Sequence, residues 1–171
     1  MLVRRGLLVS PTSAEGLFGR AGALLRRRHV PRAIQTYREA AKKAPHEPRY
    51  HNDLGVALLA AADRGGARTA FHRAAVLAAN FPHPYYNLGI LCREDGGGAA
   101  AAEKWFDEGL RRDPDRMAAH RYVARLYEDL FDDPERARRH YSAYVGEGGR
   151  DEEVLSRAAA LGVRDLPRSC Y

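Results

Sequence analysis

The chain contains 171 residues, of which 45% are hydrophobic and 29% are charged, a composition typical of a folded globular protein and unlike that of disordered or fibrous chains. The net charge of +6 is uneven: residues 1–45 hold ten Lys or Arg against two acids, and residues 46–171 hold eighteen against twenty. The longest apolar run, residues 56–62, is far shorter than the roughly 20 residues that cross a bilayer, so no membrane span is expected.

Residues 1–12 are predicted to form a flexible N-terminal segment. Their apolar stretch at residues 7–9 is shorter than the roughly 7 to 15 residues of a secretory signal, so a cytoplasmic location is expected. The sequence Thr12-Ser13-Ala14-Glu15 can form a capping box, and it predicts that the first helix begins here. The basic run at residues 26–29 then closes that helix, where positive charge complements the helix dipole.

An internal repeat organises the rest of the chain. Four alanines recur at separations of 34, 35 and 35 residues: Ala33, Ala67, Ala102 and Ala137. Four residues after each alanine stands an aromatic residue, and these are Tyr37, Phe71, Phe106 and Tyr141. Repetition at this period indicates stacked supersecondary units, each too small to fold alone.

A second series runs upstream of the first and stays in phase with it. It contains a large residue followed by a small one, in the pairs Leu54-Gly55, Leu88-Gly89 and Val123-Ala124. Both series have the spacings of three and four residues that identify amphipathic helices, so each unit is predicted to be a pair of helices. The small residues are expected to let the two helices approach closely, as at Gly89.

Prolines and glycines mark the breaks between the predicted helices. Pro31, Pro48 and Pro134 suit the first turns of helices. The predicted units cover residues 14–47, 48–81, 82–116 and 117–151. A capping helix is predicted at 151–161 and a flexible tail at 163–171, so one domain occupies residues 13–162.

These residues resemble the tetratricopeptide repeat, a helix–turn–helix unit of 34 residues with this pattern of small and aromatic positions. The resemblance covers about residues 14–151. It implies an all-α fold in which antiparallel helix pairs stack into a right-handed superhelix. It also implies an adaptor or scaffold that binds a peptide or helical segment of a partner protein in a concave groove.

The reactive residues do not converge on an enzyme site. The seven histidines form no His-Glu-x-x-His motif and no cluster with cysteine, so no metal and no cofactor are predicted. His51 and His120 occupy repeat positions and are interpreted as packing residues. Cys92 occupies a core position and is expected to be buried and inert, and Cys170 lies in the tail. The protein is therefore predicted not to be an enzyme.

The first helices of the units carry a second stripe, roughly opposite the core positions, because a helix turns about 100° per residue. The resemblance implies that this stripe lines the groove. The predicted groove residues are Phe18, Arg49, Asn52, Val56, His83, Tyr86, Asn87, Ile90, Arg121 and Arg125. Tyr86 is expected to be an exposed apolar anchor, Asn52 and Asn87 to hold peptide backbone, and Arg121 and Arg125 to bind carboxylates. The expected partner is acidic or presents a C-terminal carboxylate.

Two alternatives to the adaptor remain. The size suits a chaperone like those of type III secretion, although the basic charge makes this less attractive. A nucleic-acid-binding repeat protein would use the basic N-terminal third and would need stacking aromatic residues on the same face, so it is less favoured. Neither the identity of the partner nor the oligomeric state is predicted.

Overall fold

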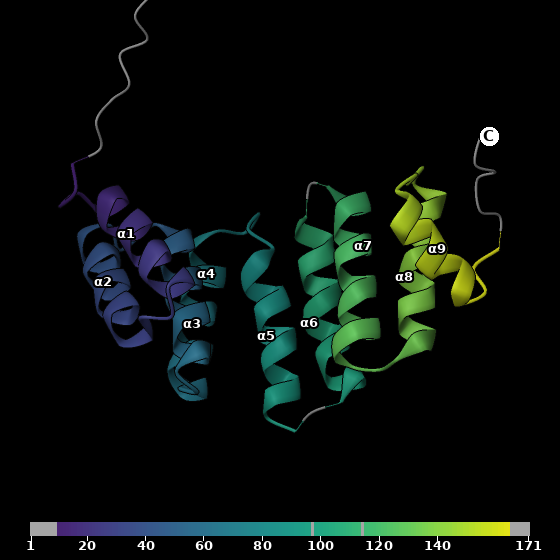
Figure 1. Ribbon diagram of the computed structural model, residues 1–171, viewed down its shortest axis with the longest axis horizontal. Helices are drawn as coiled ribbons and strands as arrows, with labels where there is room; N and C mark the ends of the chain where they lie inside the picture. The colour runs from purple at the N-terminus through teal and green to yellow at the C-terminus, as the bar shows by residue number, and fades with distance from the viewer. Residues whose placement is uncertain (1–9, 97, 114, 165–171) are drawn as a thin grey trace, which may run out of the picture. The chain divides into compact units, whose positions relative to one another are not determined.

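The computed structural model describes residues 10–96, 98–113 and 115–164. Within these ranges the chain forms nine α-helices and one π-helical turn, with no strand (Figure 1). The predicted all-α class is therefore confirmed. No helix among the described residues is long and apolar enough to cross a membrane.

Contacts within the chain divide it into two compact units, residues 1–79 and 80–171. The first unit contains α1 (Ala14–Arg26), α2 (Val30–Lys43), α3 (Pro48–Ala60) and α4 (Arg64–Leu77). Each helix packs on its neighbour in the chain, and α1 also touches α3. The prediction of a single continuous domain stays a prediction.

The second unit contains two helix pairs and a final helix. These are α5 (His83–Glu94), α6 (Ala99–Arg112), α7 (Arg116–Arg125), α8 (Pro134–Gly146) and α9 (Glu152–Ala160). The first helix of its second pair ends in a π-helical turn, η1 (Leu126–Leu130), which the sequence pattern did not predict. Residues 1–9 and 165–171, most of the segments predicted to be flexible, lie outside the described residues.

Several helices begin where the sequence predicts. Ser13 is the N-cap of α1, and its hydroxyl oxygen accepts a hydrogen bond of 3.0 Å from the Gly16 N–H, so Ser13 rather than Thr12 provides the cap. Pro31, Pro48 and Pro134 lie in the first turns of α2, α3 and α8. Proline is tolerated there because the N–H that it lacks would have no partner within the helix.

The repeated small and aromatic residues are the core positions of the second helices. The four repeat alanines, Ala33, Ala67, Ala102 and Ala137, are each 0% exposed. The four aromatic residues that follow them, Tyr37, Phe71, Phe106 and Tyr141, are at most 2% exposed. The packing role inferred from the period is therefore confirmed.

Glycine lies where the two helices of a pair touch. A Cβ atom added to Gly55 would lie 2.5 Å from Cε1 of Phe71, and one added to Gly89 would collide with the Phe106 ring. A side chain at either position would push the two helices apart. The close contact predicted at Gly89 is thus confirmed, and it joins α5 to α6.

A residue in the left-handed conformation ends the first helix of every pair. The φ angles are +61° at Arg28, +60° at Ala62, +81° at Gly96 and +51° at Asp132. At the first of these turns the N–H of His29 donates to the carbonyl of Leu24 at 2.9 Å, which is the backbone pattern of a Schellman cap. The turn geometry therefore repeats even where the residue type does not.

Candidate functional site

The predicted groove residues of the first unit begin with Phe18 on α1. Its ring stacks on Tyr50 at a centroid distance of 4.7 Å and meets the edge of Tyr37 at 5.7 Å. Burial, and secondarily the hydrogen bond to Glu15, raises the pKa of Tyr50 to about 12. Phe18 is half-buried, so it belongs to an aromatic cluster that joins α1, α2 and α3.

On α3 the structure separates the three predicted residues by exposure. Val56 is 37% exposed and Arg49 is also exposed, its Nε donating to the Glu47 carboxylate at 3.0 Å. Asn52 is only 6% exposed, and its side-chain amide donates to the Asp53 carboxylate at 3.0 Å. The burial of Asn52 leaves little of its amide available to hold the backbone of a bound peptide.

Tyr86 corrects the predicted site. The expectation that its ring points away from the core is wrong, because the residue is 4% exposed and belongs to the core of the second unit. Its ring fills the space beside Gly109, where a Cβ atom would collide with it. Its hydroxyl donates to the Asp113 carboxylate at 3.0 Å. Burial is the main cause that raises the pKa of Tyr86, and the negative charge of Asp113 is the second.

An exposed aromatic ring lies beside the buried one. Tyr122 on α7 is 43% exposed, and its ring centroid is 5.3 Å from that of Tyr86. Met117, also on α7, is 37% exposed. Tyr122 is not among the predicted groove residues, although it follows Arg121 directly and precedes Arg125 by three residues, a spacing that puts all three on one side of a helix.

Arg121 and Arg125 lie on this exposed side, but acids of the same chain already face them. The Arg121 guanidinium is 3.7 Å from the Asp151 carboxylate, and that of Arg125 is 3.6 Å from Asp129 and 3.8 Å from Glu153. An open pocket of about 570 Å³ lies among these residues, between α7, η1 and the start of α9. A carboxylate of a partner must therefore compete with Asp129, Asp151 and Glu153 for the two arginines.

The remaining predicted residues lie on α5. His83 is exposed and its ring lies 5.0 Å from that of Phe81, whereas Asn87 and Ile90 are half-buried. The structure thus keeps part of the predicted stripe accessible in each unit and buries Asn52 and Tyr86.

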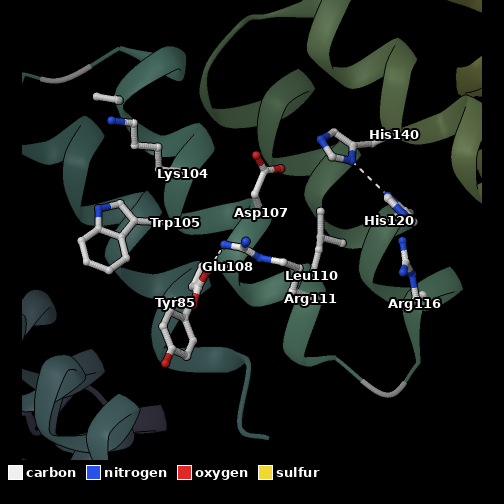
Figure 2. A pocket seen from close by; sticks show the side chains of 11 residues that line it. Tyr85, Lys104, Trp105, Asp107, Glu108, Leu110, Arg111, Arg116, His120 and His140 are labelled. Carbon is white, nitrogen blue, oxygen red and sulfur yellow. Dashed lines mark hydrogen bonds and ion pairs between the residues drawn. The ribbon is translucent and has the colours of Figure 1, made fainter. Parts of the chain in front are cut away.

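A larger open pocket of about 880 Å³ lies elsewhere on the second unit, over α6 (Figure 2). Tyr85, Lys104 and Trp105 line one part of it, and Arg116, His120 and His140 line the other. The sequence did not predict this pocket. Its walls come from four helices, α5 to α8, and they meet only in the folded chain.

Two histidines face each other at one side of this pocket. Nδ1 of His120 on α7 is 3.1 Å from Nδ1 of His140 on α8, so one neutral ring donates and the other accepts. Burial is the main cause that lowers the pKa of both histidines. For His140, the neighbouring His120 and Arg139 add to the effect of burial, and the pKa falls to about 4. His140 also stacks on Tyr127 at 5.5 Å.

These contacts agree with the packing role predicted for His120. His51 is likewise half-buried, and its Nε2 donates to the carbonyl of Pro45 at 3.0 Å.

The described residues contain no group of three or more His, Cys, Asp or Glu side chains that could hold a metal ion. Cys92 is half-buried, less enclosed than its repeat position predicts. Cys170 lies outside the part of the chain that the structure describes.

Comparison with known proteins identifies the repeat. Residues 2–48 and 18–84 match the sequence profile of the tetratricopeptide repeat. The chain is 41% identical over 88 residues to the TPR repeat-containing protein PA4299 of Pseudomonas aeruginosa, and this match covers 51% of the chain and 36% of the relative. It is 34% identical over 108 residues to the cytochrome c-type biogenesis protein CycH of Bradyrhizobium diazoefficiens, covering 60% of the chain and 29% of that protein. The matches thus span about a third of the length of these relatives.

Solved structures agree on the fold. TTC0263, a thermophilic tetratricopeptide-repeat protein of Thermus thermophilus, superposes with a TM-score of 0.70 at 17% sequence identity, over 89% of this chain and 82% of its own. The protein of the Pseudomonas aeruginosa pilF structure superposes with a TM-score of 0.64 at 20% identity, over 90% of this chain and 75% of its own. At these identities the likeness concerns the fold alone.

Proposed function

We propose, from the premise that the chain is a tetratricopeptide-repeat protein, that it is an adaptor which binds a peptide or helical segment of a partner protein. The family supports a role in protein–protein interaction. The proposed surface is the exposed side of α7 in the second unit, together with Asn87 and Ile90 on α5. In the first unit, taken by itself, the accessible residues of the predicted stripe on α3 are Val56 and Arg49. We further propose that the protein acts in the cytoplasm and does not catalyse a reaction.

The observation that carries this proposal is the exposed Tyr122. A large ring that is 43% exposed and lies between two arginines is the mixture that binding surfaces use, because the ring supplies contact area and arginine recognises carboxylates. In this proposal the buried ring of Tyr86 packs against Tyr122 and positions it, and Tyr122 is the residue that contacts the partner.

The test compares the wild-type protein with the triple variant Tyr122→Ala, Arg121→Ala and Arg125→Ala. Peptides selected by the wild type from a random library, acidic and C-terminal sequences included, are titrated by fluorescence anisotropy. We expect the triple variant to bind at least about tenfold more weakly, since exposed aromatic and arginine anchors dominate such interfaces. Its thermal midpoint should change little, because all three side chains are exposed.

A matched control removes three exposed side chains of α4 and α8, which lie outside the proposed surface, in Arg73→Ala, Val76→Ala and Arg139→Ala. If the control weakens the selected peptides as much as the groove variant does, or if the groove variant binds them fully, the proposed surface is wrong.

A further inference from the structure

The two units differ in how many of their basic side chains are ion-paired. In the second unit nine arginines are ion-paired with acids of the same unit. Arg136, for example, donates from Nε and Nη2 to the Glu103 carboxylate at 3.2 and 3.1 Å, and from Nη1 to Asp133 at 2.6 Å. These pairs neutralise most of the positive charge there.

The first unit has the opposite character. Residues 1–79 hold fourteen Lys or Arg against five Asp or Glu, a net charge of +9, whereas residues 80–171 hold fourteen against seventeen, a net charge of −3. Eight exposed basic residues lie on α1, α2 and the turn between them, and we call them the basic patch: Arg20, Arg26, Arg27, Arg28, Arg32, Arg38, Lys42 and Lys43. In the described part of the chain none of the eight makes an ion pair.

The backbone brings several of these charges together. Arg26, Arg27 and Arg28 stand in sequence at the end of α1, and Arg28 adopts a φ of +61°, a conformation that an arginine rarely takes. Arg20 from α1 and Arg32 from α2 line the same small cavity of about 220 Å³. Glu39 is the one acid that lines this cavity with them. The resulting surface has a net positive charge, and its basic side chains are not ion-paired.

We propose that the basic patch binds an acidic segment of a partner protein, as a docking surface separate from the groove. A guanidinium group can donate two parallel, forked hydrogen bonds to one carboxylate. Inside this chain, Nε and Nη2 of Arg136 both donate to Oε2 of Glu103. A cluster of eight unpaired charges would also increase the rate of encounter with an acidic partner. In this proposal the basic patch makes the first contact with the acidic partner, and the groove determines which partner segment is bound.

Two other occupants fit the patch less well. Binding to single-stranded nucleic acid relies on stacking of bases on aromatic rings. The aromatic rings of α1 and α2 are turned inward, with Phe18 stacked on Tyr50 and Tyr37 only 2% exposed. A second copy of this chain is a poor partner because nine acids of its second unit are already ion-paired with that unit's own arginines.

The test measures binding of a fluorescent Glu-rich peptide of about 16 residues to the full chain, at about 50 and about 300 mM NaCl. We expect the wild type to bind, and the added salt to weaken binding by about tenfold or more, because exposed charges are screened. The patch variant carries Arg26→Ser, Arg27→Ser, Arg28→Gly and Arg32→Ser. It should lose at least about tenfold in affinity at the lower salt.

Three controls separate the explanations. Removing four exposed arginines from the second unit, by Arg111→Ser, Arg116→Ser, Arg139→Ser and Arg150→Ser, changes the net charge equally and should alter affinity less than about threefold. The groove variant should still bind the acidic peptide, which distinguishes failure of this proposal from failure of the groove. A version with lysine at the four patch positions keeps the charge and should bind at least about threefold more weakly, because lysine lacks the fork.

Some outcomes overturn the proposal. If the second-unit variant loses as much affinity as the patch variant, binding reflects net charge and the patch is not a site. If an oligonucleotide of equal charge binds more tightly than the peptide, the surface recognises phosphate and the partner is nucleic acid. If the groove variant alone abolishes peptide binding, the acidic segment lies in the groove. If the lysine version binds as tightly as arginine, forked pairing is excluded.

Discussion

At the scale of single residues, the absence of a side chain at Gly89 decides how closely α5 can approach α6. The Phe106 ring occupies the volume that a Cβ atom would need. The same relation holds at Gly55 with Phe71 and, with the roles of the helices exchanged, at Gly109 with Tyr86. Each of these glycines is a packing position, because its replacement must move a buried ring.

Gly89→Leu should lower the free energy of unfolding by about 1 to 3 kcal/mol, since overpacking forces the ring or the helix to shift. The midpoint in urea denaturation measures this loss. Gly19→Ala is the matched control, because Gly19 lies in α1 with no atom within 4 Å of its added Cβ. Alanine is also the better helix former, so this variant should be slightly more stable. Equal midpoints for Gly89→Leu and the wild type would show that the contact is misassigned.

At the scale of helices, the hydrogen bond between His120 and His140 ties α7 to α8. At least one ring must be neutral for it to form, because two imidazolium ions at 3.1 Å offer no acceptor nitrogen and repel each other. The groups that also act on the pair are Glu103 and Asp107 of α6, Arg116 of α7, Arg139 of α8 and Glu147. Burial outweighs the acids among them, since both pKa values are lowered.

Acidification should therefore loosen this helix pair. The pKa of His140 is about 4 in the folded chain and 6.5 as an ordinary value, so the unfolded chain binds the additional proton between these limits. The free energy of unfolding should be highest above pH 6.5 and should fall as the pH drops from 6.5 toward 4. Below pH 4, protonation of His140 should lower it no further. Thermal midpoints across this range for the wild type and for His140→Phe, which can keep the stack on Tyr127, measure the effect. Parallel pH profiles for the two proteins would exclude the histidine pair as the cause.

At the scale of the whole molecule, each helix packs chiefly on its neighbours in the sequence within its own unit. The stability of such an array is close to a sum of local terms. Substitutions in different units that share no partner should therefore act independently, whereas substitutions in one helix pair should influence each other.

Gly55→Ala and Gly109→Ala test this expectation, because their partners Phe71 and Tyr86 belong to different units. Their losses of unfolding free energy should add to within about 0.5 kcal/mol. The matched pair Gly89→Ala and Gly109→Ala disturbs α5 and α6 twice and should depart further from additivity. Urea denaturation of the single and double variants gives both quantities. A larger departure in the first pair than in the second would contradict the local account of stability.

The sequence by itself determined the repeat and its core. Ala33, Phe71 and Gly89 were identified from spacing alone, because a helix that packs on its neighbour in the chain must place a small or large residue at fixed intervals. Proline and serine positions likewise located several helix starts, since their effect on the backbone is local.

Only the tertiary structure decided the details of the surface. Tyr86 lies on the predicted stripe, yet its ring turns inward because Gly109, on another helix, leaves room for it. The contacts of Arg121 with Asp151 and of His120 with His140 join residues 30 and 20 positions apart, and no period in the sequence relates them. Helical spacing determines which side of a helix a residue occupies, but the shape and charge of the facing helices determine whether that residue is free to bind.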